Sequence, residues 1–237
     1  MPAMIRVIFH WHAFLEIKGE GFSLLLDPFV SGNPKADVSL EQVLAIPELK
    51  WIALTHWHDD HLGDTVPIAK AREEIKVIAT FELAQYLQNV KGLKNVHSMH
   101  IGGKFDFGDF VLKYVPAIHG GGIDDLQSTY TTVAGGILVK IWDKKIYHAG
   151  DTALTMDMKL LEQEQIDVAF LPIGDNSTMG IEDAVRAVEF IKPKIVVPIH
   201  YGTWPVIDTD PTEFARQVML QDIAKPKVLN PGDELPL

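Results

Sequence analysis

Three histidines and three aspartates lie within the eleven residues of LTHWHDDHLGD, at positions 54–64. Four of them, His56, His58, Asp60 and His61, form the pattern H-x-H-x-D-H. Histidines two residues apart project to one side of an extended turn, whereas helical neighbours are three or four apart. Imidazole and carboxylate are the usual non-thiolate ligands of zinc, manganese and iron. A polar loop that happens to be rich in histidine is the alternative, but it has no use for this spacing. The motif therefore indicates a divalent-metal site.

The chain of 237 residues contains no cysteine. Disulfides, thiolate metal sites, iron–sulfur clusters and cysteine nucleophiles are therefore excluded. Any metal must be held by His, Asp and Glu side chains alone.

Three further candidate ligands directly follow apolar runs typical of strands, as the first motif does. His119 follows FVLKYVPAI and precedes three glycines, which let backbone approach a ligand closely. Asp151 lies in IYHAGDT, and His200 ends IVVPIH. Each alone could be a structural residue that only forms hydrogen bonds, but their shared placement favours a ligand role. If Asp151 bridges two ions, the seven donors form two three-ligand sets and leave positions for water, as in catalytic sites.

Five other polar residues are weaker candidates. His12, in HWHAF, is expected either to contact the substrate or a ligand side chain, or to serve packing. Asp27 is expected to fix the tautomer of a ligand histidine. His148, close to the bridging aspartate, could help to bind an anion. Asp175 and Thr178, in GDNSTMG, are expected to line the pocket, with capping of a helix as the alternative.

These residues need a scaffold of short strands, each followed by a loop, since loops at strand ends are held rigidly where ligands bind. Alternating or β-rich runs predict strands over residues 5–9, 14–17, 22–26, 51–54, 76–79, 110–115, 136–141, 145–149, 167–171 and 195–199. Helices are predicted over residues 65–73, 81–87 and 181–191, and WDKK is a predicted hairpin turn. Another helix is expected to begin at Asp210, with Pro at the first helical position and Glu at the third.

The order of these elements predicts an α/β fold. Two similar halves, each with several strands and then helices, suggest two sheets packed face to face with helices outside. The chain shows no repeat, low-complexity tract or linker. A single domain spanning residues 1–237 is therefore expected. His97 and His100, in NVHSMHIGG, are expected to be surface or turn residues outside the site.

Composition and charge limit the partners. A hydrophobic fraction of 47% with 22% charged residues is typical of a soluble globular protein, and the formal net charge of −11 argues against nucleic acid. No apolar run approaches the ~20 residues of a membrane-spanning helix, so no membrane partner is expected. The first residues, MPAMIRVIFHWHAF, lack an export signal, which predicts a cytoplasmic location. A small-molecule substrate is the expected partner, and homo-oligomerisation is left open.

The ordered motifs resemble the metallo-β-lactamase superfamily. Within it, DPF (27–29), GNP (32–34), THWHDDHLGDT, YHAGDTAL and LPIGDNSTMG are similar to an uncharacterised branch of metal-dependent hydrolases near the ascorbate-6-phosphate lactonase group. The resemblance spans nearly the whole chain. It implies a four-layer αββα sandwich, with two mixed β-sheets and a dinuclear site at one edge. Trp57 departs from the family, which usually has a small residue there.

The resemblance also implies a ligand set. One metal would be held by His56, His58 and His119, and the other by Asp60, His61 and His200, with Asp151 between them. Either Zn²⁺ or Mn²⁺ suits these two sites. Secreted β-lactamases differ by a cysteine ligand and an export signal, glyoxalase II and the processing nucleases by extra domains, and flavodiiron proteins by a carboxylate at the position of His58 and an appended flavin domain.

A one-domain hydrolase of a small molecule remains as the expected function. Two dications lower the pKa of a shared water to near neutrality, and Asp60 could orient this nucleophile and carry a proton to the leaving group. A lactone, another ester, an amide or a phosphodiester could be the group attacked. The alternative is a metal-binding sensor or assembly protein that retains the fold without hydrolytic activity.

Overall fold

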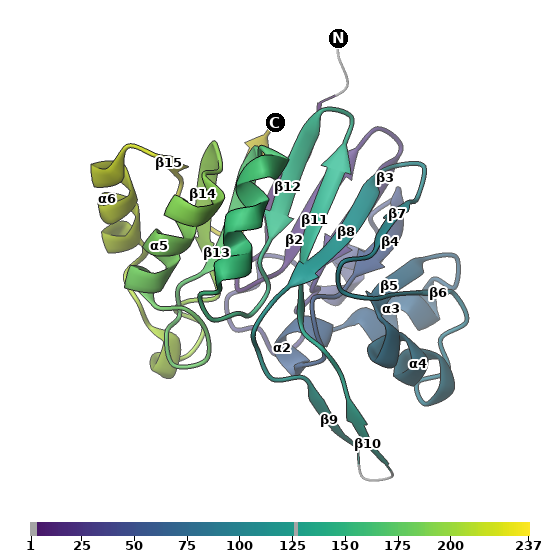
Figure 1. Ribbon diagram of the computed structural model, residues 1–237. Coiled ribbons are helices and arrows are strands. Elements are labelled where there is room, and N and C mark those ends of the chain that lie inside the picture. Colours follow the sequence, from purple (N-terminus) through teal and green to yellow (C-terminus); the bar gives the residue numbers. More distant parts are fainter. Residues whose placement is uncertain (1–3, 126–127) are drawn as a thin grey trace. The chain divides into compact units, whose positions relative to one another are not determined.

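The computed structural model of the protein describes residues 4–125 and 128–237 and consists of two compact units (Figure 1). Unit 1 comprises residues 1–103, 120–134 and 230–237, and unit 2 comprises residues 104–119 and 135–229. Each unit contains a seven-stranded mixed sheet. Within the described ranges, no helix combines the length and the apolar character needed to cross a membrane. That the chain is one domain stays a prediction.

The sheet of unit 1 has the strand order β16-β1-β2-β3-β4-β5-β6. Strands β3 to β6 are parallel to one another, while β2 is antiparallel to both β1 and β3. Strands β1, β3 and β4 therefore run in the same direction, and their carboxyl ends meet at one edge of the sheet. The strands are β1 Arg6–Phe9, β2 Leu15–Gly19, β3 Phe22–Leu26, β4 Leu49–Ala53, β5 Lys76–Thr80, β6 Val96–Met99 and β16 Glu234–Pro236. A separate hairpin pairs β9 Gly122–Asp125 with β10 Ser128–Thr131.

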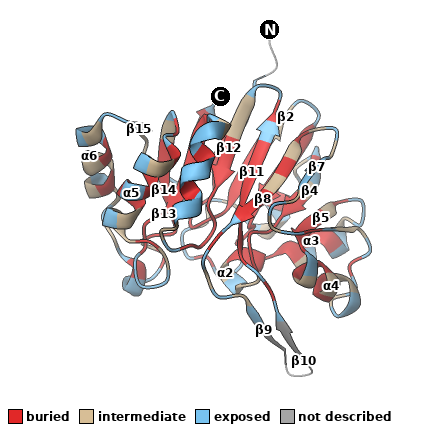
Figure 2. Ribbon diagram, in the orientation of Figure 1, coloured by how far each residue is buried: buried red, intermediate tan, exposed pale blue. Residues whose placement is uncertain are grey.

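The helices of unit 1 bury one apolar face against this sheet. Ile68, Leu83 and Leu87 belong to the same buried cluster as Ile52 and Val77 of the strands. Figure 2 shows the same pattern, with buried strands and helices that keep an exposed side. Burying apolar side chains of this size contributes about 1.5–3 kcal/mol each. The helices are α1 Leu40–Leu44, α2 Asp59–Leu62, α3 Thr65–Ala71 and α4 Phe81–Asn89.

The sheet of unit 2 has the strand order β15-β14-β13-β12-β11-β8-β7. Strands β12 to β15 are parallel, and β11 is antiparallel to both β8 and β12. Strands β8, β12 and β14 therefore end at the same edge. The strands are β7 Lys104–Asp106, β8 Val111–Pro116, β11 Gly135–Ile141, β12 Lys144–His148, β13 Val168–Pro172, β14 Ile195–Ile199 and β15 Lys225–Pro226.

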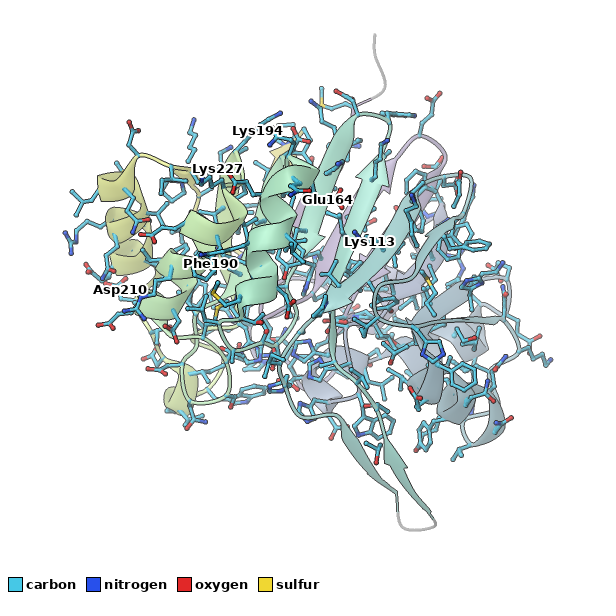
Figure 3. All side chains as sticks on the ribbon, in the orientation of Figure 1. Lys113, Glu164, Phe190, Lys194, Asp210 and Lys227 are labelled. Atoms are coloured by element: carbon cyan, nitrogen blue, oxygen red, sulfur yellow. The ribbon has the colours of Figure 1, made fainter. Side chains whose placement is uncertain are left out.

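Two α-helices and two 3₁₀ helices complete unit 2: α5 Ile181–Ile191, α6 Pro211–Gln221, η1 Met156–Glu164 and η2 Pro205–Ile207. Helix α5 buries a stripe that includes Val188 and Ile191. An ion pair ties η1 to the sheet, because Lys113 Nζ of β8 lies 3.0 Å from Glu164 Oε1 (Figure 3).

Most sequence-predicted elements are confirmed, with shifted ends. The strands at 22–26 and 195–199 and the helix at 181–191 have the predicted bounds, and Asp210 caps α6 by accepting from Thr212 N at 2.8 Å. The helix predicted over residues 65–73 ends at Ala71, because Arg72 leaves the helix (φ −132°) and donates to Ile46 O at 2.6 Å. Several short elements were not predicted: α1, α2, η1, η2, β6, β7, β9, β10, β15 and β16.

A glycine joins the metal-binding motif to helix α3. Gly63 has φ 46° and ψ −128°, a conformation that side chains other than glycine's rarely adopt. A Cβ atom at this position would lie 2.3 Å from Pro28 O and 2.7 Å from Phe29 Cα. The close approach lets Asp64 N donate to Pro28 O at 2.9 Å, which connects the loops after β3 and β4.

We expect Gly63→Ala to lower the free energy of unfolding by about 2–5 kcal/mol, from the left-handed backbone and the clash together. Gly92→Ala is the matched control: its φ is +75°, but nothing lies within 4 Å of the added Cβ. The control should lose only about 1–2 kcal/mol. Urea unfolding measures both changes, and equal losses would contradict the close packing of Gly63 against Pro28.

Candidate metal centre

The H-x-H-x-D-H motif begins three residues after the end of strand β4 and continues into helix α2. His56 and His61 are completely buried, and their ring centroids are 4.1 Å apart. His58 is the N-cap residue of α2, and its ring centroid lies 4.6 Å from that of His56. The extended segment followed by one helical turn therefore brings all three rings of the motif together within unit 1, as the spacing predicted for His56 and His58.

Asp27 and Thr55 determine the orientation of two of these rings. Asp27, directly after β3, accepts from Thr55 N at 2.8 Å and from Thr55 Oγ1 at 2.5 Å. His61 Nδ1 lies 2.7 Å from Asp27 Oδ2, and because a carboxylate only accepts, this nitrogen carries the proton. The hydroxyl of Thr55 uses its hydrogen to donate to Asp27, so its oxygen accepts from His56 Nδ1 at 3.0 Å. Both histidines are thereby left with their lone pair on Nε2.

The separations of the donor atoms suit a small dication. His56 Nε2 lies 3.0 Å from His58 Nδ1. Two nitrogen ligands of one tetrahedral zinc, each about 2.0–2.1 Å from the ion, are roughly 3.3 Å apart. Side-chain nitrogen and oxygen atoms of His12, Asp60 and His61 likewise lie within 4.8 Å of one another. His12 is buried, and its Nε2 lies 2.9 Å from Asp60 Oδ2.

In unit 2, one carboxylate oxygen lies close to two histidines. Asp151 Oδ2 is 3.4 Å from His119 Nε2 and 3.2 Å from His200 Nε2. The three residues follow β8, β12 and β14, whose carboxyl ends meet at one edge of the sheet. Asp151 and His200 are each only 3% exposed, so their charge and polarity need compensation inside the protein. A cation ligated by these atoms would supply it.

The donor set of both units therefore fits a divalent metal. It consists of imidazole nitrogens and carboxylate oxygens, as the absence of cysteine requires, and these donors suit zinc or manganese. Three residues in or beside these donor sets have left-handed backbone conformations, His12 (φ 59°), Asp27 (φ 49°) and His200 (φ 55°). Such strain in residues other than glycine costs about 1–3 kcal/mol each and concentrates at functional sites.

Two threonines next to the predicted ligands were not identified from the sequence. Thr55 connects Asp27 to His56, as described above. Thr152, directly after Asp151, accepts from Ile118 N at 3.0 Å through its hydroxyl, and Ala153 N donates to Ile118 O at 3.0 Å. These bonds tie the loop of His119 to the loop of Asp151. The signal was present in the sequence, since each threonine is adjacent to a candidate ligand.

Three of the weaker candidates, His148, Asp175 and Thr178, lie near the ligand loops of unit 2. His148 is buried in β12, and its Nδ1 accepts from Gly150 N at 2.9 Å, which supports the turn before Asp151. Met179 N donates to Thr152 O, so the loop of Asp175 and Thr178 is bonded to the same turn. The capping alternative for this loop is not supported, because the N-cap of α5 is Gly180 and no side-chain cap bond is formed. The roles of these three residues towards an anion or substrate stay predictions.

Tyr201 directly follows His200 and is 4% exposed. Burial raises the pKa of Tyr201 to about 12. His97 lies in β6, half-buried, and His100 is exposed just after it, with its ring stacked on Phe81 at 5.0 Å. Neither histidine joins the donor set of unit 1.

Comparison with known proteins identifies the family. The β-lactamase superfamily domain matches residues 23–201. The chain is 46% identical over 234 residues to a UPF0173 metal-dependent hydrolase of Enterococcus faecalis, covering 98% of this chain and 99% of the relative. It is 48% identical over 240 residues to one of Bacillus mycoides, covering 99% and 100%. The chain therefore belongs to this family of metal-dependent hydrolases, within the metallo-β-lactamase superfamily that the motifs predicted.

Comparison with a solved structure supports the same fold. A novel metallo hydrolase from the hyperthermophilic archaeon Ignicoccus hospitalis matches with a TM-score of 0.88 at 29% identity, covering 99% of this chain and 98% of that one. Together with the two mixed seven-stranded sheets and their helices, this likeness confirms the predicted fold class, the αββα sandwich of the metallo-β-lactamase type.

The contacts of Asp27 lead to a prediction. Asp27→Asn replaces one of the two accepting carboxylate oxygens with an NH₂ group that cannot accept and removes the negative charge beside His61, so the Nδ1–H tautomer of His61 loses stabilisation. We expect metal affinity to fall about 10–100-fold. Asp59→Asn, an exposed change in the same motif, should bind metal as the wild type does. Calorimetric titration with Zn²⁺ measures both, and equal affinities for the two variants would contradict this role of Asp27.

Proposed function

We propose that this chain is a dinuclear metal-dependent hydrolase of a small molecule. The single observation that carries the proposal is the placement of Asp151 Oδ2 between His119 Nε2 and His200 Nε2, at 3.4 and 3.2 Å. A carboxylate shared in this way is suited to bridging two cations, one for each histidine. The proposed ligands are His56, His58 and His119 for one ion, Asp60, His61 and His200 for the other, with Asp151 bridging.

When bound, two dications would supply a hydroxide nucleophile at neutral pH and polarise the carbonyl or phosphoryl oxygen of the substrate. The side chains of this protein prepare that chemistry. Asp27 and Thr55 keep the lone pairs of His61 and His56 on Nε2, as their contacts indicate. The Asp60 side chain, 22% exposed, is held at Oδ2 by His12. Its Oδ1 is the atom that we propose to take the proton of the attacking water and to pass it to the leaving group.

The substrate class is proposed from the motifs. The similarity to hydrolases near the ascorbate-6-phosphate lactonase group supports a lactone, and other esters and phosphodiesters share the required electrophilic centre and leaving oxygen. Hydrolysis of any of them adds water across the scissile bond: the hydroxide joins the carbonyl carbon or phosphorus, and the departing oxygen takes the proton. Zn²⁺ and Mn²⁺ are the ions that we propose.

The bridge leads to a prediction about metal content. Asp151→Ala removes the carboxylate between two dications, so we expect the variant to lose at least one of two ions per chain. Its hydrolysis should fall more than about 100-fold, beyond the loss typical of outer partners of a metal site. His97→Ala is the control: it removes a polar side chain outside the proposed site and should retain both ions and most activity. Elemental analysis and turnover measure the two variants. If Asp151→Ala keeps two ions while His97→Ala loses them, the ligand set must be redrawn.

Removal of metal tests the reaction itself. We expect wild-type protein treated with a chelator to lose hydrolysis and to recover it with Mn²⁺ or Zn²⁺, because the chain has no cysteine and no serine in a nucleophile-elbow sequence. A panel of lactones, carboxylic esters, phosphodiesters and β-lactams is the assay. Full turnover by verified metal-free protein would overturn the mechanism. Two bound ions without turnover of any class would favour the non-catalytic sensor or assembly protein.

A further inference from the structure

The turn after strand β1 contains two consecutive left-handed residues that are not glycine. Trp11 has φ 79° and His12 has φ 59°. Each such residue costs about 1–3 kcal/mol and persists only where the surrounding structure holds it in place. The strained turn matters because it carries His12, whose buried ring meets Asp60.

The neighbouring residue, His10, has a carboxylate near each ring nitrogen, one within hydrogen-bond distance and one at ion-pair distance. Its side chain is 5% exposed, Nδ1 lies 2.9 Å from Asp37 Oδ1 and Nε2 lies 3.5 Å from Glu16 Oε2. Glu16, on β2, is itself held by Ser23 Oγ at 2.9 Å and by Lys18 Nζ at 3.5 Å. Asp37 lies in the loop before α1. His10 is therefore fixed between two elements that come from different parts of unit 1.

The backbone of His10 closes the strained turn. His10 N donates to Phe14 O at 2.9 Å, Phe14 N donates to Trp11 O at 3.0 Å, and the rings of His10 and Phe14 are 4.5 Å apart. With His10 immobile, the chain between it and Phe14 has little room to relax, so the left-handed conformations of Trp11 and His12 are retained.

The consequence of the turn is the contact at Asp60. His12 Nε2 lies 2.9 Å from Asp60 Oδ2, and its ring packs edge-on against the rings of Phe29 and His61, at 5.6 and 5.7 Å between centroids. A hydrogen bond from this nitrogen restrains the carboxylate and leaves its second oxygen directed elsewhere. His12 thus acts on the residue that carries the proton in the proposed reaction.

We propose that His10 is a positioning residue that, anchored by Asp37 and Glu16, holds the turn in which His12 Nε2 restrains the carboxylate of Asp60. This inference rests on the proposed function of Asp60. His10 does not touch the reacting atoms, and it acts only through His12. The protein would therefore use three polar side chains outside the metal ligands, the buried His10 and Glu16 and the more exposed Asp37, to keep its proton carrier in one orientation.

Three substitutions of His10 separate the contributions of its two contacts. His10→Leu removes both contacts. His10→Asn replaces Nδ1 with an amide nitrogen and retains the shorter contact, to Asp37, whereas His10→Gln retains only the longer one, to Glu16. His100→Leu is the matched control, since this exposed histidine lies outside the site. We expect kcat of the Zn²⁺-loaded protein to fall about 10-fold or more in His10→Leu, with KM changed less than about threefold. His10→Asn should recover most of the loss and His10→Gln less.

Histidine ¹⁵N NMR supplies a readout that does not require turnover. In the Zn²⁺-loaded wild type, the Nε2–H proton of His12 should be shifted downfield and exchange slowly with water, and it should be lost in His10→Leu but retained in His10→Asn and His100→Leu. Persistence of this signal in His10→Leu would overturn the proposal, as would equal losses of kcat in the Leu and Asn variants. If the wild type hydrolyses nothing in the panel, the NMR comparison still decides the role of His10, so its failure and that of the proposed function are separate results.

Discussion

The metal-binding half of unit 1 depends on the hydrogen bonds of one buried carboxylate, that of Asp27. Removing a carboxylate from water costs several kcal/mol, and here the backbone and hydroxyl of Thr55 and the imidazole of His61 offset this cost. The register of the sheet makes the contact feasible: Leu26 pairs with Ala53, so the residue after β3 lies beside the start of the loop after β4. One charge at the end of one strand thereby determines the proton positions of two histidines that follow its neighbour.

In unit 2, the metal-binding side chains are positioned by hydrogen bonds that backbone N–H groups donate within and between loops. His148 accepts from Gly150, Thr152 is bonded to Ile118, and Met179 donates to Thr152, so the loops after β8, β12 and β13 are connected beside Asp151. His200 reaches the same carboxylate from the end of β14 with a left-handed backbone. Since parallel strands bring their loops to one edge, a few hydrogen bonds between loops suffice to converge three donors.

Polar groups outside the donor set also help to hold the site residues in place. Burial lowers the pKa of His10, but its hydrogen bonds to Asp37 and Glu16 raise it by more, so the pKa lies above its ordinary value. The shift reflects the two carboxylates that face its ring nitrogens, Asp37 at 2.9 Å and Glu16 at 3.5 Å. The strained backbone at Trp11 and His12 is therefore held by the contacts of His10 with Asp37 and Glu16, together with the contact of His12 with Asp60.

The sequence by itself determined the family, the chemistry and most of the regular elements. Spacing and the lack of cysteine pointed to His56, His58, Asp60 and His61 as N/O donors, and apolar runs ending in His119, Asp151 and His200 showed which strand ends would carry the rest. These signals are local, because an i, i+2 spacing or a strand followed by a polar residue is visible in a short window. The short helix over Asp59–Leu62 and the edge strands were missed, since so few residues carry no periodicity. Only the tertiary structure decided that Asp27 contacts His61, that Asp151 Oδ2 meets two histidines, and that His12 Nε2 meets Asp60 Oδ2. Each of these contacts joins residues distant in the chain, and sheet register and left-handed turns, rather than residue type, determine which of the many polar side chains meet.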